Sequence, residues 1–167
     1  MISGRLGFAY AIDGQVEKGA DLLDFARLRS AGVVHIHGWS LAFSGWVEYQ
    51  RGAATTGLTR QHQAVQLARQ HGYRGMEVWA LWLLGTMLRG SGRFAEARDV
   101  FKEAIVLARS LEMRLHYVYC CEALAEVCGR PGQSEEASEA RDEAERILAE
   151  SDIMGRLTLG TELRGER

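Results

Sequence analysis

Hydrophobic residues recur at three- and four-residue steps along most of the chain, with polar residues between them. This periodicity is typical of amphipathic α-helices, whose apolar side chains share one face. The chain contains a single proline, Pro131, so little in it interrupts a helix. The pattern therefore predicts an all-α protein with helices over residues 2–13, 16–31, 35–50, 54–71, 75–90, 94–111, 115–129 and 134–151.

The pattern also repeats after forty residues. The stretch Ala64–Tyr73 returns as Ala104–Met113, and the same step carries Trp39 onto Trp79 and then onto Tyr119. A period of about 20 to 50 residues is typical of arrays whose units bury their apolar faces against their neighbours. The sequence predicts one repeat domain over residues 1–154, with units at about 1–33, 34–73, 74–113 and 114–154, and a polar tail at 155–167.

Glycines separate the two helices of each unit. Gly52, Gly92 and Gly132 are in register and each is expected to end a first helix with positive φ, as is Gly14 one unit earlier. Ser134 is expected to cap the last helix. The first unit departs from the forty-residue step, since Gly14 lies 38 residues before Gly52. Its joining loop is therefore expected to differ.

The third unit resembles the tetratricopeptide consensus in its small and large packing positions, which are Leu81, Leu84, Gly85, Leu88, Ala97, Phe101 and Ala104. The resemblance implies a right-handed superhelical array of about four antiparallel helix pairs. In such a pair, the small residues Gly85 and Ala97 let the two helices approach closely. The usual unit is about 34 residues, and the longer unit here resembles the extended arrays of large bacterial signalling proteins.

The segment from Met113 to Leu157 is similar to the C-terminal region of multidomain ATPase regulators that carry an adenylate cyclase or transcription-activator domain. It departs from them at Gly155-Arg156, where an aromatic pair is usual. The chain has no Gly-x-x-x-x-Gly-Lys loop for a nucleotide and no alternating strands of a cyclase fold. Few residues precede Leu6, so the first helix is expected to be truncated. We expect either further repeats before it in a longer protein or pairing of this end with a second copy.

The resemblance implies that the first helix of each unit lines a concave surface. On the third such helix, Trp79, Trp82 and Arg89 point away from the packing residues. Extending this arc to the neighbouring units gives the candidate groove residues Trp39, Trp46, Tyr49, Trp79, Trp82, Arg89, Tyr119, Glu122, Glu126 and Arg130. Large aromatic side chains suit a recognition groove because they bury much apolar area. The same stripe could instead pack between units, and the sequence leaves both interpretations open.

The polar members of the arc, Arg89, Arg130, Glu122 and Glu126, would form a mixed rim able to hold a carboxylate or a basic side chain. Glu122 and Glu126 lie one turn apart, but general acid–base catalysis needs a closed pocket, which an open array rarely provides. No Ser, Cys or His has a base and an orienting partner in motif spacing. We expect no enzymatic activity and no cofactor.

The three cysteines, Cys120, Cys121 and Cys128, form no Cys-x-x-Cys motif and are expected to be reduced thiols. His116 and Cys120 lie one helical turn apart without further ligands nearby, so no metal is expected. The net charge of −2 and the scattered cations argue against nucleic acid as a partner. No apolar run suits a membrane span and no signal peptide is evident, so we expect a cytoplasmic protein.

These observations favour a non-catalytic protein–protein interaction module. Its expected partner is a protein or peptide segment, or another domain of the same bacterial signalling or regulatory protein. One alternative is a sensor whose concave aromatic groove binds a small-molecule effector. Another is an oligomerisation module that forms a homodimer through the truncated N-terminal end.

Overall fold

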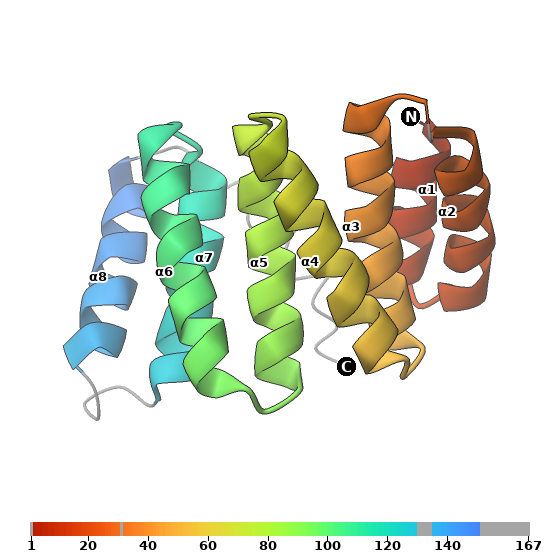
Figure 1. The fold of residues 1–167 in the computed structure, drawn as a ribbon. Coiled ribbons are helices and arrows are strands. Elements are labelled where there is room, and N and C mark those ends of the chain that lie inside the picture. The colour runs from red at the N-terminus through yellow and green to blue at the C-terminus, as the bar shows by residue number, and fades with distance from the viewer. Residues whose placement is uncertain (1, 31, 130–134, 151–167) are drawn as a thin grey trace.

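The computed structural model of the 167-residue chain describes residues 2–30, 32–129 and 135–150. These residues form eight α-helices and no strand (Figure 1). The helices are α1 (Ile2–Ile12), α2 (Val16–Ser30), α3 (Val34–Gln50), α4 (Ala54–Gln70), α5 (Arg74–Gly90), α6 (Phe94–Ser110), α7 (Arg114–Cys128) and α8 (Glu135–Glu150). Each helix begins and ends within one residue of the position expected from the sequence. The tail at 155–167 lies outside the described residues.

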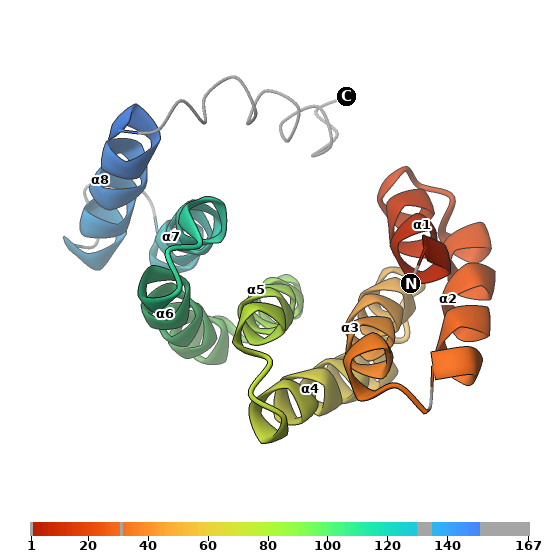
Figure 2. The same cartoon turned by 90° about the horizontal axis from the view of Figure 1, so that it is seen from above.

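The helices form a curved array in which each packs against the next along the chain. Figure 2 shows the array as an arc, with α1, α3, α5 and α7 on its inner side and α2, α4, α6 and α8 on its outer side. Each inner helix also contacts the next inner helix. The expected all-α, solenoid-like array of helix pairs is confirmed.

Small residues bring the two helices of a pair together. A Cβ atom added to Gly85 of α5 would lie 2.5 Å from the ring of Phe101 on α6. Phe101 and its helical neighbours Ala97 and Ala104 are completely buried. The main core extends from this pair to α3 and α4 on one side and to α7 and α8 on the other, and a smaller apolar cluster joins α1, α2 and α3.

A glutamine replaces the aromatic residue in the core of the second pair. Gln61 of α4 lies forty residues before Phe101 and is fully buried. Its Nε2 donates a hydrogen bond of 2.9 Å to the backbone oxygen of Ala80, whereas its Oε1 has no hydrogen-bond partner. Because an unpaired buried oxygen is unfavourable, this position weakens the second unit.

The glycine turns agree with the sequence analysis, whereas the irregularity of the first unit lies in the length of its second helix and not in its joining loop. Gly52 and Gly92 follow α3 and α5 with φ values of 86° and 74°. The 38-residue offset arises because α2 has 15 residues whereas α4 has 17. The expectation of a different joining loop is wrong, because Gly14 has a φ of 83° and the backbone N–H of Gln15 donates to the oxygen of Tyr10 as that of Ala53 donates to the oxygen of Glu48. Gly132 and Ser134 lie outside the described residues.

Candidate functional site

A groove of about 510 Å³ lies along the inner side of the array. Every residue that lines it comes from an inner helix, α1, α3, α5 or α7 (Figure 2). The lining consists of Phe8, Ile12, Trp46, Trp79, Trp82, Leu83, Thr86, Arg89, Tyr119, Glu122, Ala123 and Glu126. The structure thus brings seven of the ten candidate residues together in one concave site.

Aromatic rings in contact form the centre of this groove. The ring centroids of Trp79 and Trp82 are 5.8 Å apart, and those of Trp82 and Tyr119 are 5.9 Å apart. Trp79 also contacts Trp39 at 6.1 Å and His116 at 4.7 Å. All of these side chains are partly buried. Trp79 and Trp82 therefore fit both interpretations, because they pack between units and also line the groove.

Two candidate residues of α3 do not line the groove. Trp39 packs against Phe43 at a ring distance of 5.4 Å, and its indole N–H donates to Nε2 of His35 at 3.2 Å. Tyr49 stacks on Trp46, and its hydroxyl lies 3.5 Å from Oγ of Ser91 in the turn after α5. Trp39 joins α3 to α5 through its ring contact with Trp79, and Tyr49 joins α3 to the turn after α5. Arg130, the remaining candidate, lies outside the described residues.

Charged side chains occupy one side of the groove. Arg89 of α5 forms an ion pair with Glu126 of α7, and Glu122 lies one turn before Glu126 on the same helix. The side chains of Arg89 and Glu126 are 32% and 52% exposed, so the pair forms a solvated rim. With one arginine and two glutamates, the described part of the lining carries a formal charge of −1.

Sequence reasoning missed the wall that α1 contributes. Phe8 stacks on Phe43 with centroids 4.4 Å apart, and Ile12 is 40% exposed at the end of α1. The predicted groove residues come only from the second, third and fourth units, because the first unit is out of register with the forty-residue step. The 38-residue offset carried the missing information, because it aligns Phe8 with Trp46.

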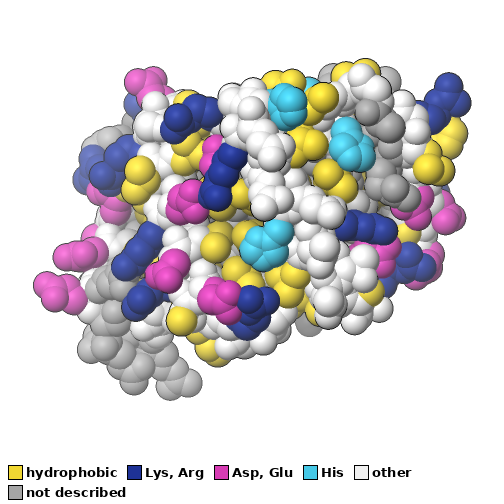
Figure 3. All heavy atoms as spheres, in the orientation of Figure 1, with side chains coloured by type: hydrophobic (Ala, Val, Ile, Leu, Met, Phe, Trp, Pro, Cys, Tyr) yellow, Lys and Arg dark blue, Asp and Glu magenta, His cyan; other side chains and the backbone are white. Residues whose placement is uncertain are grey.

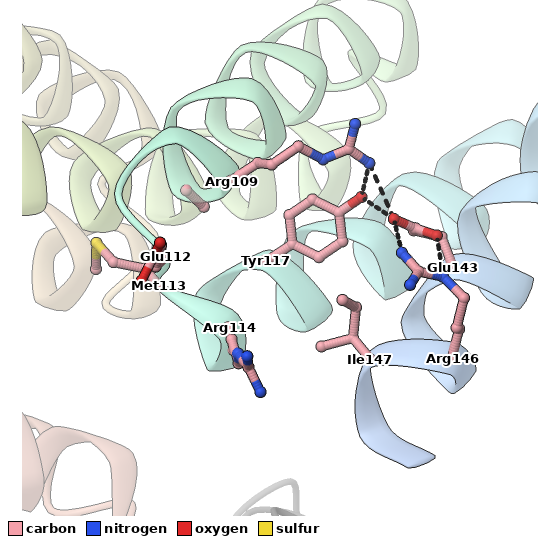
Figure 4. A pocket seen from close by; sticks show the side chains of 9 residues that line it. Arg109, Glu112, Met113, Arg114, Tyr117, Glu143, Arg146 and Ile147 are labelled. Atoms are coloured by element: carbon pink, nitrogen blue, oxygen red, sulfur yellow. Dashed lines mark hydrogen bonds and ion pairs between the residues drawn. The ribbon is translucent and has the colours of Figure 1, made fainter. Parts of the chain in front are cut away.

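A second pocket, of about 450 Å³, lies where the turn between α6 and α7 meets α8 (Figure 4). In it, Arg109 donates to the hydroxyl oxygen of Tyr117, which in turn donates to Glu143 at 2.9 Å. Arg109 and Arg146 also form ion pairs with Glu143 at 2.9 and 2.7 Å. Hydrogen bonding from Arg146, supported by Tyr117 and Arg109, lowers the pKa of Glu143 to about 2. Burial raises the pKa of Tyr117 to about 12.

The same arrangement occurs one unit earlier, so it serves the architecture. Arg69, Glu77 and Glu103 each lie forty residues before Arg109, Tyr117 and Glu143. Arg69 donates to Glu77 at 2.8 Å and forms an ion pair with Glu103. In both cases an arginine at the end of one outer helix joins the two helices of the next unit. We call these two clusters the arginine clasps.

Cys120, Cys121 and His116 of α7 have pKa values shifted by burial. Burial raises the pKa of Cys121 to about 11 and that of Cys120 further, so both thiols are protonated near neutral pH. Burial lowers the pKa of His116, which contacts Trp79. The described part of the chain contains no group of three or more His, Cys, Asp or Glu side chains placed to hold a metal ion.

Two further observations concern the class of protein. None of the helices in the described ranges has the length and apolar character needed to cross a membrane. No protein-family model matches the chain, and no curated protein is significantly similar to it. The fold class defined by the structure is an all-α array of stacked helix pairs.

Proposed function

We propose that this chain is a non-catalytic interaction module, a tetratricopeptide-like array that binds a segment of a partner protein in its concave groove. The partner would be a separate protein or another domain of a larger bacterial signalling or regulatory protein. The groove of about 510 Å³, lined by four inner helices, carries this proposal. A cytoplasmic location is part of it.

The lining has the composition of a recognition surface. Trp46, Trp79, Trp82 and Tyr119 offer large rigid faces, and aromatic side chains of this kind dominate the binding energy of many interfaces. Because packing between units already holds these rings, little side-chain entropy remains to be lost on binding. On the outer side, the pocket of about 450 Å³ is bordered by the ion pairs of an arginine clasp. In Figure 3, the described acidic and basic side chains of that side are interspersed, which does not favour nucleic acid.

A peptide-library selection against the immobilised chain tests the proposal. Selected peptides should bind in solution, and Trp82→Ala should weaken that binding at least about tenfold, as expected for loss of a central aromatic residue. The control is Phe94→Ala, which truncates an aromatic side chain that is 55% exposed at the start of α6, away from the groove. Equal binding by the two variants would refute the groove as the binding site.

A small-molecule effector is the second candidate, supported by the size of the groove. A volume of about 510 Å³ falls within the range of about 300–1,000 Å³ that is typical of small-molecule sites. Screening metabolites by intrinsic tryptophan fluorescence tests this candidate. A metabolite that shifts the emission of the chain but not that of Trp82→Ala, together with a failed peptide selection, would favour the sensor.

Exposed apolar side chains at the N-terminal end support a third candidate, self-association. Five large apolar residues of α1, α2 and the following turn are at least 40% exposed, namely Leu6, Ile12, Phe25, Leu28 and Val33. Leu28, at 71%, is the most exposed of them. If this surface joins two copies, sedimentation should detect a dimer and Leu28→Asp should yield a monomer. A monomeric parent chain at micromolar concentration would exclude this candidate.

A further inference from the structure

The groove is asymmetric across its width. Its charged residues, Arg89, Glu122 and Glu126, lie in the C-terminal halves of α5 and α7. The facing wall contributes Phe8 and Ile12 of α1, which carry no charge. An occupant that fills the groove therefore meets carboxylates on one side and apolar surface on the other.

The charge of the lining disfavours an acidic occupant. The only arginine in the described lining, Arg89, is already in an ion pair with Glu126. Together with Glu122, the charged side chains sum to −1. A carboxylate entering the groove would have to displace Glu126 from Arg89 and would also meet the negative charge of Glu122. Like charges brought together in this way weaken binding.

The same groups suit a cation. Tyr119 and Glu122 lie three residues apart on one face of α7, so an aromatic ring and a carboxylate are neighbours there. Trp82 approaches Tyr119 from α5, with ring centroids 5.9 Å apart. Lysine ammonium and arginine guanidinium groups bind favourably to tryptophan and tyrosine faces and form charge-assisted hydrogen bonds with carboxylates.

We propose that the groove selects a partner segment in which a lysine or arginine is adjacent to a large apolar residue. The basic side chain lies against Trp82 and Tyr119 with its charge toward Glu122 and Glu126, and the apolar side chain contacts Phe8 and Ile12. This inference rests on the proposed function and adds the chemistry of the partner.

Three capped probe peptides, acetyl-Gly-Leu-X-Leu-Gly-amide with X as lysine, glutamine or glutamate, separate the alternatives. Titration of the ¹⁵N-labelled chain, followed at its four tryptophan indole N–H signals, reports binding in the millimolar range. The lysine peptide should bind about two- to fivefold more tightly than the glutamine peptide, corresponding to one exposed cation–π contact. The glutamate peptide should bind most weakly.

Substitutions of the charged rim residues test the proposal by the direction in which each changes the affinity for the lysine peptide. Glu122→Gln and Glu126→Gln should each weaken binding of the lysine peptide, whereas Arg89→Met should strengthen it by removing a competing cation. Glu145→Gln is the matched control, because Glu145 is an exposed carboxylate of α8 outside the groove. Thermal unfolding of each variant confirms that it is folded.

Different outcomes separate failure of this inference from failure of the proposed function. Tighter binding of the glutamate peptide, with loss of binding in Arg89→Met, would overturn the inference in favour of a site for carboxylates. Equal binding of the lysine and glutamine peptides would overturn it in favour of apolar recognition alone. In both cases the proposed function survives. If neither these probes nor any peptide selected from a library binds, the proposed function fails and the inference fails with it.

Discussion

The close approach of α5 and α6 at Gly85 leads to a quantitative prediction for Gly85→Ala. A Cβ atom at this position would lie 2.5, 2.8 and 2.8 Å from three ring atoms of Phe101, whereas ordinary contacts are 3.4–4 Å. The ring cannot move away freely because Phe101 is completely buried. The added methyl group therefore forces the two helices or the ring to shift.

Two opposing effects set the size of the change. Overpacking of a core costs about 1–3 kcal/mol. Replacing glycine by alanine inside a helix stabilises the folded state by about 1 kcal/mol through helix propensity. We expect Gly85→Ala to lower the free energy of unfolding by up to about 2 kcal/mol. In a Phe101→Ala background the overlapping ring atoms are absent, so the same substitution should raise stability by up to about 1 kcal/mol.

Urea denaturation of the parent chain, the two single variants and the double variant measures this coupling as a double-mutant cycle. The expected coupling energy is about 1–3 kcal/mol. Gly75→Ala is a control, since a Cβ there would meet only Sδ of Met113, at 4.0 Å. That variant should be neutral or slightly stabilised. If Gly85→Ala has the same effect in both backgrounds within about 0.5 kcal/mol, the packing argument is wrong.

Three further substitutions probe polar features of the array by urea denaturation. Gln61→Leu should stabilise the chain by about 1 kcal/mol, because it removes an unpaired buried oxygen at the loss of one hydrogen bond to Ala80; destabilisation would contradict this account. Glu112→Gly should also stabilise it by about 1 kcal/mol, since Glu112 has a left-handed φ of 54°; an unchanged midpoint would argue against strain there. Glu143→Gln should destabilise it at pH 7 by about 1–2 kcal/mol, less than the full pKa shift implies because the paired arginines are exposed. The pKa of Glu143 is lowered from 4.5 to about 2, so its contribution to the free energy of unfolding is present above pH 4.5 and is lost as the pH falls toward 2. If the stability difference between this variant and the parent chain stays constant between pH 7 and pH 2.5, the clasp does not stabilise the fold.

The sequence was sufficient to predict the helices and the inner face of the third and fourth units. Trp79, Trp82 and Tyr119 follow from helical periodicity and the forty-residue step, and the structure places all three in the groove. Trp39 and Tyr49 satisfy the same periodicity, but Trp39 packs against Trp79 of α5 and Tyr49 contacts Ser91 in the turn after α5. A helical wheel gives the direction of a side chain from its own axis. It does not tell whether a neighbouring helix fills the space in that direction.

The arginine clasps show a second limit of reading a repeat. Arg69 and Arg109 occupy equivalent positions of the stretch that first indicated the repeat, yet neither suggested a contact. Their partners are 8 and 34 residues further on, and those spacings become neighbours only when one unit stacks on the next. The group that accepts from the arginine differs between the two units, because it is the carboxylate of Glu77 in one clasp and the hydroxyl of Tyr117 in the other. A search for identical residues therefore passes over it.

The clasps and the aromatic centre together account for the existence of a groove. In a curved array, neighbouring inner helices are closer together than neighbouring outer helices. The inner helices meet through side chains in direct contact, as Trp82 and Tyr119 do between α5 and α7. The outer helices are joined by long arginine side chains, such as Arg109, which reaches from α6 to Glu143 on α8. A straight stack would leave the inner face flat. The concave site therefore depends on the short contacts between inner helices and the long arginine contacts between outer helices as much as on the residues that line it.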